Sequence, residues 1–328
     1  MNFSTNIVSK HRSSLMGIAI LWVILYHMVA KGTEYFDFKY LNALFNQGDS
    51  GVDIFMFLSG WGLYLSFKKY SILEFYKRRF ARILPLYMII CLIFIMAING
   101  NIMDYLSCVS TFGFWMGGIW YDWYIPAILL FYLLYPLIGK STDKFGILPF
   151  IISITVCVGL ISYTQISTDC QFGDIRMFVL SRFPIFVLGA YWGYLQFEKK
   201  QREKMCLCFA ISGVVCFAFF YWFLAHTHFL LFSGVRQLLH ILYAPGMCFL
   251  FSAMLEAVNK YTNIVNRILY FCGVMSLELY LIHVKFFGQM PFFNTDYRIF
   301  YGFTILVVTF LLAYPTHILL GKLNKVIS

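Results

Sequence analysis

The sequence has few charged residues. Only 12% of its 328 residues are Asp, Glu, Lys or Arg, whereas a soluble domain carries about 25%. Because so few charges cannot cover a water-facing surface, a soluble enzyme, a disulfide scaffold and a nucleic-acid-binding protein are all disfavoured. Apolar side chains dominate instead: 61% of residues are hydrophobic and 20% are aromatic, which also argues against disorder. The composition therefore indicates an integral membrane protein.

The chain also lacks linkers, low-complexity tracts and obvious repeats, so we expect one domain over residues 1–328. Cysteine occurs nine times, and seven of these residues lie in or at the edge of apolar segments, where packing accounts for them. Cys108 and Cys170 lie in predicted loops instead. These two thiols would suit an oxidising compartment, but their pairing does not follow from the sequence.

Ten apolar runs approach the length of about 20 residues that a membrane-spanning helix needs. They cover residues 14–31, 51–67, 83–99, 123–139, 146–164, 177–196, 205–225, 239–257, 268–286 and 300–320. The predicted fold class is therefore an all-α, polytopic bundle of about ten transmembrane helices.

Lys and Arg are unevenly divided between the two sets of alternate connecting segments. The set that includes both termini holds 18 of the 25 basic residues, the other set holds six, and Arg182 lies inside a predicted span. Basic residues are retained on the cytoplasmic side of a membrane. We therefore predict that both termini are cytoplasmic, and the net charge of +10 does not require an acidic macromolecular partner.

Charged and histidine side chains inside a span are costly, so they usually face a cavity or a partner. Five of them map to the central or outer half of the predicted bundle: His27, Asp53, Arg182, Glu278 and His283. Their similar depth favours one shared wet cavity. The alternatives are that the histidines are packing residues, that Asp53 and His283 sit at the interface, and that Arg182 and Glu278 form a structural ion pair.

A basic cluster follows the second predicted span: Lys77, Arg78, Arg79 and Arg82. One interpretation is a topology anchor that also binds anionic lipid. The other is a phosphate clamp, because arginine forks match phosphate oxygens. Arg78 and Arg82 are four positions apart and would share one helical face. Two further histidines, His226 and His228, lie in an outer loop and are weak evidence for metal, so no metal is expected.

In their order, these segments resemble the membrane-bound acyltransferase-3 family of bacterial O-acyltransferases. The resemblance runs from residue 12 to about residue 286. It rests on residues 15–28 with the terminal His27, residues 51–60, the Arg-Arg-x-x-Arg motif of Arg78 to Arg82, residues 123–136, residues 182–189 and the Leu-Tyr-Leu-Ile-His run ending at His283. Each motif is short, and the ordered set of six is the specific signal.

The chain departs from the family pattern at two places. The family usually has an arginine eleven positions before its essential histidine, where this chain has Met16, and the nearest cation is Arg12. At 100° per residue, Met16 lies within about 20° of His27 and Arg12 about 60° away. Ile128 and Leu129 replace acidic residues that the family often carries. These departures indicate a subfamily variant.

The resemblance implies a cytoplasmic acyl-CoA donor, with acetyl-CoA expected, and no metal. Arg78, Arg79 and Arg82, with Arg12 beside them, would bind its phosphates. His27 would act as general base on an acceptor hydroxyl, or would carry the acyl group transiently.

The remaining polar residues of the predicted spans would support His27 in this reaction. Asp53 or Glu278 would orient the ring of His27, and Arg182 or Tyr280 would stabilise the developing oxyanion.

The implied acceptor is a hydroxyl of a cell-surface or secreted polysaccharide, or of its lipid-linked precursor, at the bacterial inner membrane. The expected partners are acyl-CoA, the glycan and membrane lipids, and glycan-assembly proteins are further candidates. A polysaccharide exporter or flippase is the alternative from another class, with the intramembrane charges lining its path. A purely structural partner of a glycan-assembly complex is a third reading.

Overall fold

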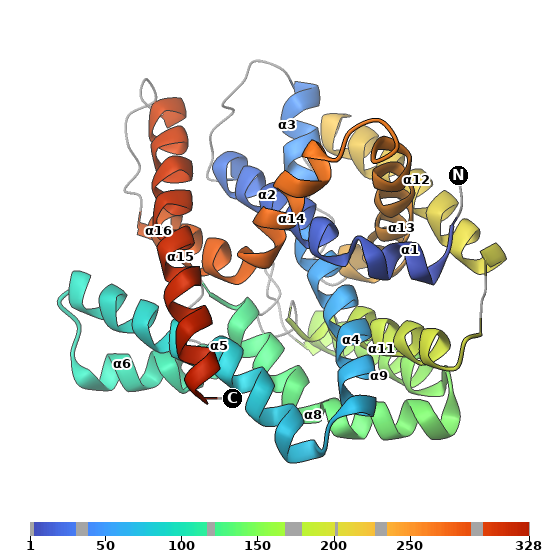
Figure 1. Cartoon of the computed structure of the whole chain (residues 1–328), viewed down its shortest axis with the longest axis horizontal. Helices are drawn as coiled ribbons and strands as arrows, with labels where there is room; N and C mark the ends of the chain where they lie inside the picture. Colours follow the sequence, from blue (N-terminus) through green and yellow to red (C-terminus); the bar gives the residue numbers. More distant parts are fainter. Residues whose placement is uncertain are drawn as a thin grey trace.

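The computed structural model describes residues 3–30, 39–116, 122–167, 179–200, 203–226, 235–289 and 298–327. The described residues are almost entirely helical. In chain order the elements are α1 Thr5–Lys10, α2 Arg12–Ala30, α3 Lys39–Asn46, the short 3₁₀ helix Gln47–Asp49, α4 Ser50–Lys69, α5 Ile72–Ala97, α6 Ile102–Val109, α7 Phe112–Trp115, α8 Tyr124–Phe145, α9 Leu148–Ser167, α11 Phe183–Phe197, α12 Glu203–His226, α13 Val235–Val258, α14 Ile264–Val274, α15 Ser276–Gln289 and α16 Arg298–Ile327 (Figure 1).

Each of the ten predicted spans overlaps one of these helices, except that residues 268–286 correspond to two. Within the described residues, five helices are long and apolar enough to cross a membrane: α5, α8, α12, α13 and α16. The pair α14 and α15 makes a sixth candidate that is bent by 64°. A multi-pass membrane protein is thus confirmed, and the count of ten spans stays a prediction.

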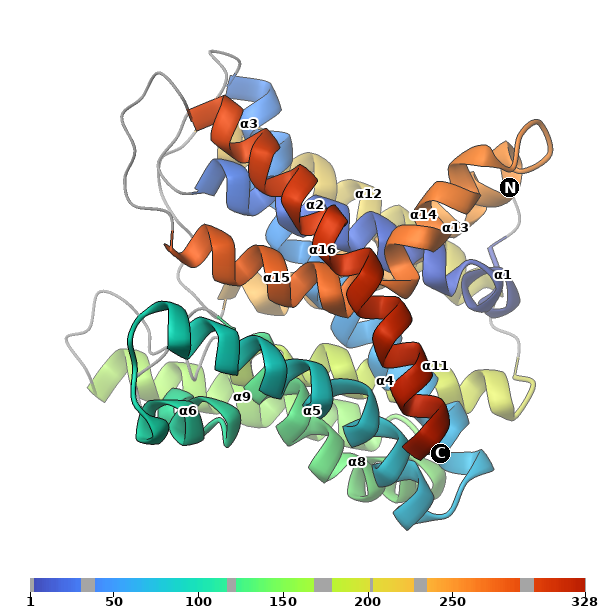
Figure 2. The ribbon, with the colours of Figure 1, turned by 60° about the vertical axis from the view of Figure 1, so that its left-hand side comes forward.

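The helices pack in two groups around α4. Figure 2 shows α5, α8, α9 and α11 on one side and α2, α13, α14 and α15 on the other, with α4 running between them. The same view places both chain ends and the connection from α4 to α5 at one side of the bundle. The ends of α2 and α5 lie at the opposite side.

Glycines allow three of the helix pairs to cross with their backbones in contact. At α4 and α11, a Cβ on Gly60 would lie 1.9 Å from the carbonyl oxygen of Phe186. Small residues permit this approach in membranes, where packing and not the hydrophobic effect joins helices. The glycine pairs are Gly60 with Gly189, Gly17 with Gly273 between α2 and α14, and Gly213 with Gly246 between α12 and α13.

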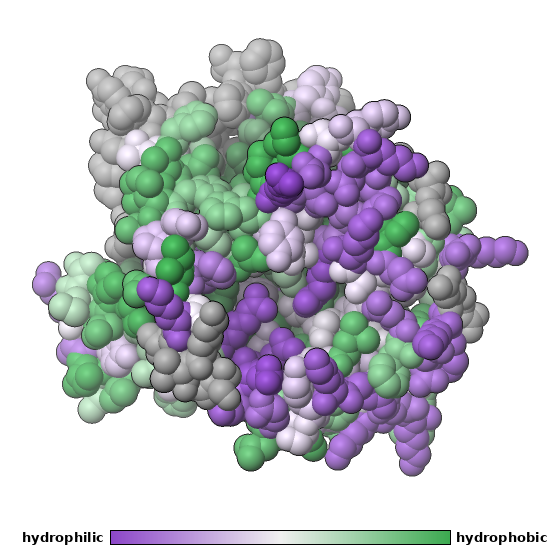
Figure 3. All heavy atoms as spheres, in the orientation of Figure 1, coloured by the Kyte–Doolittle hydropathy of each residue, from purple (hydrophilic) through white to green (hydrophobic). Residues whose placement is uncertain are grey.

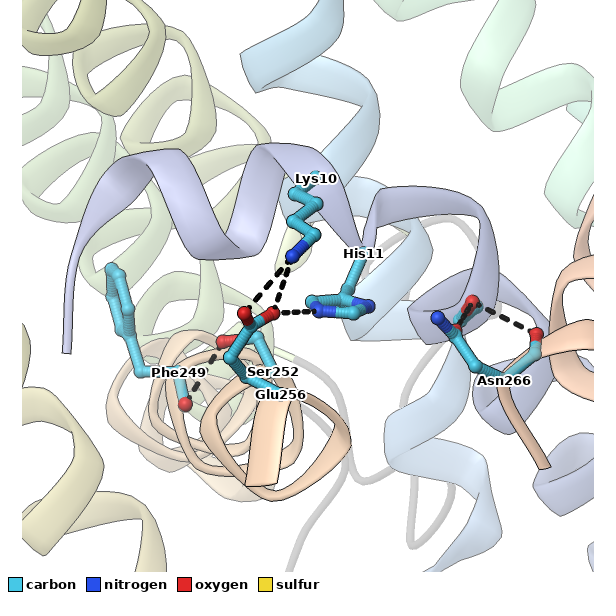
Figure 4. A network of polar contacts seen from close by, with 7 residues as sticks. Lys10, His11, Phe249, Ser252, Glu256 and Asn266 are labelled. Atoms are coloured by element: carbon cyan, nitrogen blue, oxygen red, sulfur yellow. Dashed lines mark hydrogen bonds and ion pairs between the residues drawn. The ribbon is translucent and has the colours of Figure 1, made fainter. Parts of the chain in front are cut away.

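Polar contacts fix the N-terminal helices against α13 and α14. Nζ of Lys10 lies 2.9 Å from a carboxylate oxygen of Glu256, and Nε2 of buried His11 lies 2.7 Å from the same carboxylate (Figure 4). Ser14 donates to the side chain of Asn266 at the start of α14. These contacts hold the beginning of α2, and therefore Arg12, in a defined place.

The face in Figure 3 is divided between hydrophilic and hydrophobic surface. Hydrophilic residues gather over α1 and over the lower ends of α4 and α8, while much of the surface over α6 and α16 is hydrophobic. Exposed apolar side chains such as Leu92, Met96 and Leu311 suit contact with lipid, in which apolar surface carries no cost.

The basic cluster corrects one sequence prediction. Residues 68–82, which the predicted spans leave as a connecting segment, are largely helical, because α5 begins at Ile72 and runs through the basic cluster to Ala97. The side chain of Ser71 caps this helix by accepting from the backbone N–H of Glu74. Lys77 and the three arginines therefore stand at fixed angles around the first turns of α5.

Candidate active site

A pocket lies between α2, α4, α5, α8 and α15. The empty volume in and in front of it, open solvent included, is about 680 Å³. Met16 is one of its apolar lining residues. Its polar lining consists mainly of three arginines and three tyrosines: Arg12, Arg79, Arg82, Tyr124, Tyr132 and Tyr280.

The three arginines of the pocket carry positive charge that no acidic residue among the described residues neutralises. None of them forms an ion pair with a carboxylate in the described part of the chain. Nη2 of Arg12 donates to the carbonyl oxygen of Leu58 at 3.0 Å, while the buried Nε atoms of Arg12 and Arg79 have no hydrogen-bond partner among the described residues. Such a cluster suits an anionic ligand with several oxygens.

Arg78 is placed differently from its neighbours. Its Nε lies 2.7 Å from a carboxylate oxygen of Glu74, and its guanidinium stacks 4.2 Å from the ring centre of Tyr70. It does not line the pocket. The two pocket arginines of α5, Arg79 and Arg82, are three positions apart and share a helix face. The sequence had paired Arg78 with Arg82 instead.

His27 and His283 form a hydrogen-bonded pair. Nδ1 of half-buried His27, in the last turn of α2, lies 3.1 Å from Nε2 of His283 on α15. His283 is fully buried, and its Nδ1 lies 2.7 Å from the carbonyl oxygen of Leu279. The structure thus joins two of the five predicted intramembrane groups through their rings.

These contacts assign the tautomers. A carbonyl oxygen only accepts, so Nδ1 of His283 carries a proton and, in the neutral ring, Nε2 holds a lone pair. That lone pair accepts from Nδ1–H of His27. The basic nitrogen of His27 is then Nε2, the atom that a general base needs to present to a hydroxyl.

Two tyrosines connect the pocket to this pair. The rings of Tyr124 and Tyr280 are 5.1 Å apart between centres, and those of Tyr280 and His283 are 5.7 Å apart. The hydroxyl of Tyr280 is buried and has no hydrogen-bond partner within the described residues. It is therefore a donor available in the wall of the pocket.

Asp53 and Arg182 belong to a separate buried cluster. Nε of Arg182 lies 3.1 Å from Oδ1 of Asp53, and Nδ1 of His240 lies 2.6 Å from Oδ2. The guanidinium of Arg182 also faces the ring of Trp123 at 4.8 Å. The two carboxylate oxygens of Asp53 thus face Arg182 and His240, and Asp53 orients the His240 ring.

Glu278 has another partner again. Nδ1 of His317 on α16 lies 2.7 Å from Oε1 of Glu278. The alternative of an ion pair between Arg182 and Glu278 does not hold, because Arg182 faces Asp53 and Glu278 faces His317. A wet cavity shared by all five groups stays a prediction. They divide into the histidine pair, the Asp53 cluster and the link from α15 to α16. Of the predicted site residues, the pocket itself brings together Arg12, Arg79, Arg82 and Tyr280.

Sequence reasoning missed His240 and Lys285. Lys285 lies two residues after His283, and its Nζ is 3.0 Å from Oδ2 of buried Asp122. Both were detectable as ionisable residues in or next to predicted spans, the same signal that identified Arg182. His226 and His228 give no test of metal binding, because the structure describes neither side chain.

The comparisons with known proteins give one match. The acyltransferase-3 family model, described as an acyltransferase domain, matches residues 15–318. No curated protein and no solved structure matches the chain.

Proposed function

Because the chain belongs to the acyltransferase-3 family and is a multi-pass membrane acyltransferase, we propose the donor, the acceptor and the residues of its reaction. The donor is a cytoplasmic acyl-CoA, with acetyl-CoA the expected form. The acceptor is a hydroxyl of a cell-surface or secreted polysaccharide or of its lipid-linked precursor. The protein would act as an O-acetyltransferase in the bacterial inner membrane.

The observation that carries this proposal is the cluster of Arg12, Arg79 and Arg82, which line one pocket without a carboxylate partner in the described chain. CoA carries several phosphate groups, and arginine binds phosphate through paired N–H donors. The guanidinium of Arg12 replaces the family's usual arginine, since Met16 lines the pocket at that place. Arg78 is left out of the proposed set because it pairs with Glu74.

His27 is the proposed general base. It lies 15 residues beyond Arg12 along α2, which is about 22 Å at 1.5 Å per residue. The acyl-CoA thioester would enter along the tyrosine-lined pocket toward it. Nε2 of His27 would take the proton of the acceptor hydroxyl as the oxygen attacks the thioester carbonyl. Nucleophilic attack by the same nitrogen, with a transient acyl-His, is the other route.

His283 and Tyr280 take the two supporting roles. The lone pair on Nε2 of His283 would stabilise the imidazolium that forms on His27, as an acidic residue does in a hydrolase triad. The hydroxyl of Tyr280 is the preferred oxyanion donor, because it lines the pocket and is unpartnered in the described chain. Arg182 is less suited to that role, since it already faces Asp53 at 3.1 Å.

The transferase is favoured over an exporter by the way the intramembrane charges are satisfied. Asp53, Arg182 and His240 are at most 1% exposed, and the last two both contact the carboxylate of Asp53. A translocation path would need such groups facing an aqueous channel. Interaction with membrane lipids and with glycan-assembly proteins remains part of the proposal.

The test is acyl transfer from acyl-labelled acyl-CoA in membranes that contain the acceptor glycan. We expect the parent protein to label the glycan and the His27→Ala variant to lose about 10²- to 10⁴-fold in rate, the usual contribution of a general base. Acyl-CoA binding by purified protein should survive this substitution. Full transfer by the variant would remove His27 from the mechanism, and a parent protein that binds no acyl-CoA would favour the exporter.

A further inference from the structure

The hairpin of α5 and α6 brings two cysteines together away from the pocket. Tyr87 and Cys91, one turn apart on α5, both contact Cys108 near the end of α6. The hydroxyl of Tyr87 donates to the carbonyl oxygen of Cys108 at 3.1 Å. The Sγ atoms of Cys91 and Cys108 are 3.0 Å apart. The Tyr87 contact fixes the end of α6, so the two thiols are held facing each other.

The distance between these sulfur atoms is suited to a covalent link. A disulfide bond is about 2.05 Å long, so an approach of about 1 Å would close it. The connection between α5 and α6 is short, and Asn101 caps α6 with a reciprocal contact to Asp104. Both features restrict how α6 can be placed against α5. By comparison, buried Cys157 donates its thiol to the backbone carbonyl of Leu180 at 3.1 Å.

The position of the hairpin places the pair on the outer side of the membrane. The segment from residue 68 to residue 82 holds six basic residues, and residues 99–123 hold none. By the distribution of positive charge, α5 therefore begins in the cytoplasm and ends outside. Cys91 is six residues from the end of α5, and Cys108 follows that end. Disulfides persist in such oxidising compartments.

A metal site is the competing explanation. A carboxylate oxygen of Asp122 and the two Sγ atoms all lie within 4.8 Å of one another, and all three residues are buried. However, structural zinc sites use four ligands, and the described chain supplies three here. Asp122 is also engaged, because Nζ of Lys285 lies 3.0 Å from its Oδ2. The ammonium already provides the positive charge that a metal would bring.

We propose that Cys91 and Cys108 are joined by a disulfide bond in the mature protein. The bond forms by thiol–disulfide exchange with a disulfide-bearing oxidant of the outer compartment. The two cysteines lose two electrons and two protons, and the disulfide of the oxidant is reduced to two thiols. Because Cys91 and Cys108 are 0% and 3% exposed, the exchange takes place before α6 packs onto α5, and the packed bond is then shielded from reductants.

The experiment uses the full-length chain in the membranes of intact cells. The cells are quenched in acid, denatured without a reductant in the presence of a maleimide, and the protein is digested for mass spectrometry. The expected result is a linked peptide pair that contains Cys91 and Cys108, neither of them alkylated. Cys157 and Cys272, which are buried singly, should be alkylated in the same sample and serve as internal controls.

Three results would overturn the proposal. They are complete alkylation of both cysteines, a link from Cys108 to Cys170 instead, and release of one equivalent of a metal ion on denaturation.

Two variants distinguish a specific link between Cys91 and Cys108 from non-specific oxidation of cysteines. Cys91→Ser should leave Cys108 alkylated, and Cys272→Ser should leave the link between Cys91 and Cys108 unchanged.

Discussion

The ring of His27 is oriented by a second histidine, His283. His283 can do this because its own Nδ1 is held by the carbonyl oxygen of Leu279 at 2.7 Å, which fixes the lone pair on Nε2. A neutral partner stabilises an imidazolium less than a carboxylate does, but it avoids placing an uncompensated negative charge in a buried site. The residues of the pair are 256 positions apart, so the sequence identified both without indicating that they touch.

Replacing His283 should lower the rate of the chemical step without weakening donor binding. We expect His283→Ala to reduce kcat about 10- to 100-fold, the cost of losing one hydrogen bond to a charged group, with KM for acyl-CoA nearly unchanged. His283→Gln keeps an accepting oxygen near the position of Nε2 and should recover part of the loss. Steady-state kinetics on the two variants, with His27→Ala as the reference, measures both effects.

A purely structural role for His283 predicts a different outcome. Both variants would then lose activity together with folded protein, and the glutamine would give no recovery. The amount of folded protein, measured by size-exclusion chromatography in detergent, separates the two cases.

The arginines of α5 should differ sharply in their effect on donor binding. Arg79→Ala and Arg82→Ala each remove a charged donor from the pocket, and we expect each to weaken acyl-CoA binding about 10-fold or more. Arg78→Ala is the matched control. It breaks an exposed contact with Glu74, which is worth little, and the stacking on Tyr70, both outside the pocket, so binding should stay within about two-fold.

Calorimetric titration of purified protein with acyl-CoA measures these differences. Equal losses for Arg78 and Arg79 would mean that the whole basic cluster acts as a diffuse positive surface. The predicted order, with larger losses of acyl-CoA binding for Arg79 and Arg82 than for Arg78, depends on where each arginine lies around the axis of α5. The Arg-Arg-x-x-Arg motif alone did not indicate which of them face the pocket.

At the level of helices, the sequence predicted their positions well and their contacts poorly. Apolar runs mark helices because a membrane requires every backbone group to be paired within its own segment. The run over residues 268–286 nevertheless contains a break at Met275, where α14 and α15 meet at 64°. Hydropathy is continuous across it, so the pattern predicted one span. The partners of Asp53 were equally hidden, since His240 is 187 positions away.

The crossing of α4 and α11 depends on its glycines. A Cβ on Gly189 would lie 2.1 Å from the carbonyl oxygen of Phe57, a backbone atom that cannot move aside. We expect Gly189→Ala to lower the free energy of unfolding by about 1–3 kcal/mol, typical of overpacking, and to lower the thermal midpoint in detergent. Activity should fall with it, because α4 carries the pocket residue Ser59.

Gly159→Ala is the control for that substitution. Gly159 lies on an exposed face of α9, and a Cβ there would meet nothing within 4 Å. Since alanine is the better helix former by about 1 kcal/mol, the thermal midpoint should stay the same or rise. A fall of equal size in both variants would show that the crossing tolerates an added methyl group.

For the whole molecule, one set of basic residues serves two purposes. The N-terminus, the C-terminus and the connection from α4 to α5 lie at the same side of the bundle (Figure 2). Arg12 and Arg79 line the pocket, and they lie in the first turns of α2 and α5, the helices that begin at this side. The positive charge that orients the chain in the membrane is therefore also the charge proposed to bind a cytoplasmic donor, and the two conclusions depend on the same orientation.

Labelling from outside the cell tests that orientation. Lys69 and Ser110 are both exposed, and they precede and follow α5 and α6, at predicted cytoplasmic and outer positions. A membrane-impermeant maleimide applied to intact cells should label Ser110→Cys and leave Lys69→Cys unlabelled, with the parent protein giving the background from native cysteines. Disruption of the membrane should make Lys69→Cys reactive, because only the bilayer protects it. The reverse pattern would place the arginine cluster on the outer side, where no acyl-CoA is supplied, and would exclude the proposed donor together with the predicted topology.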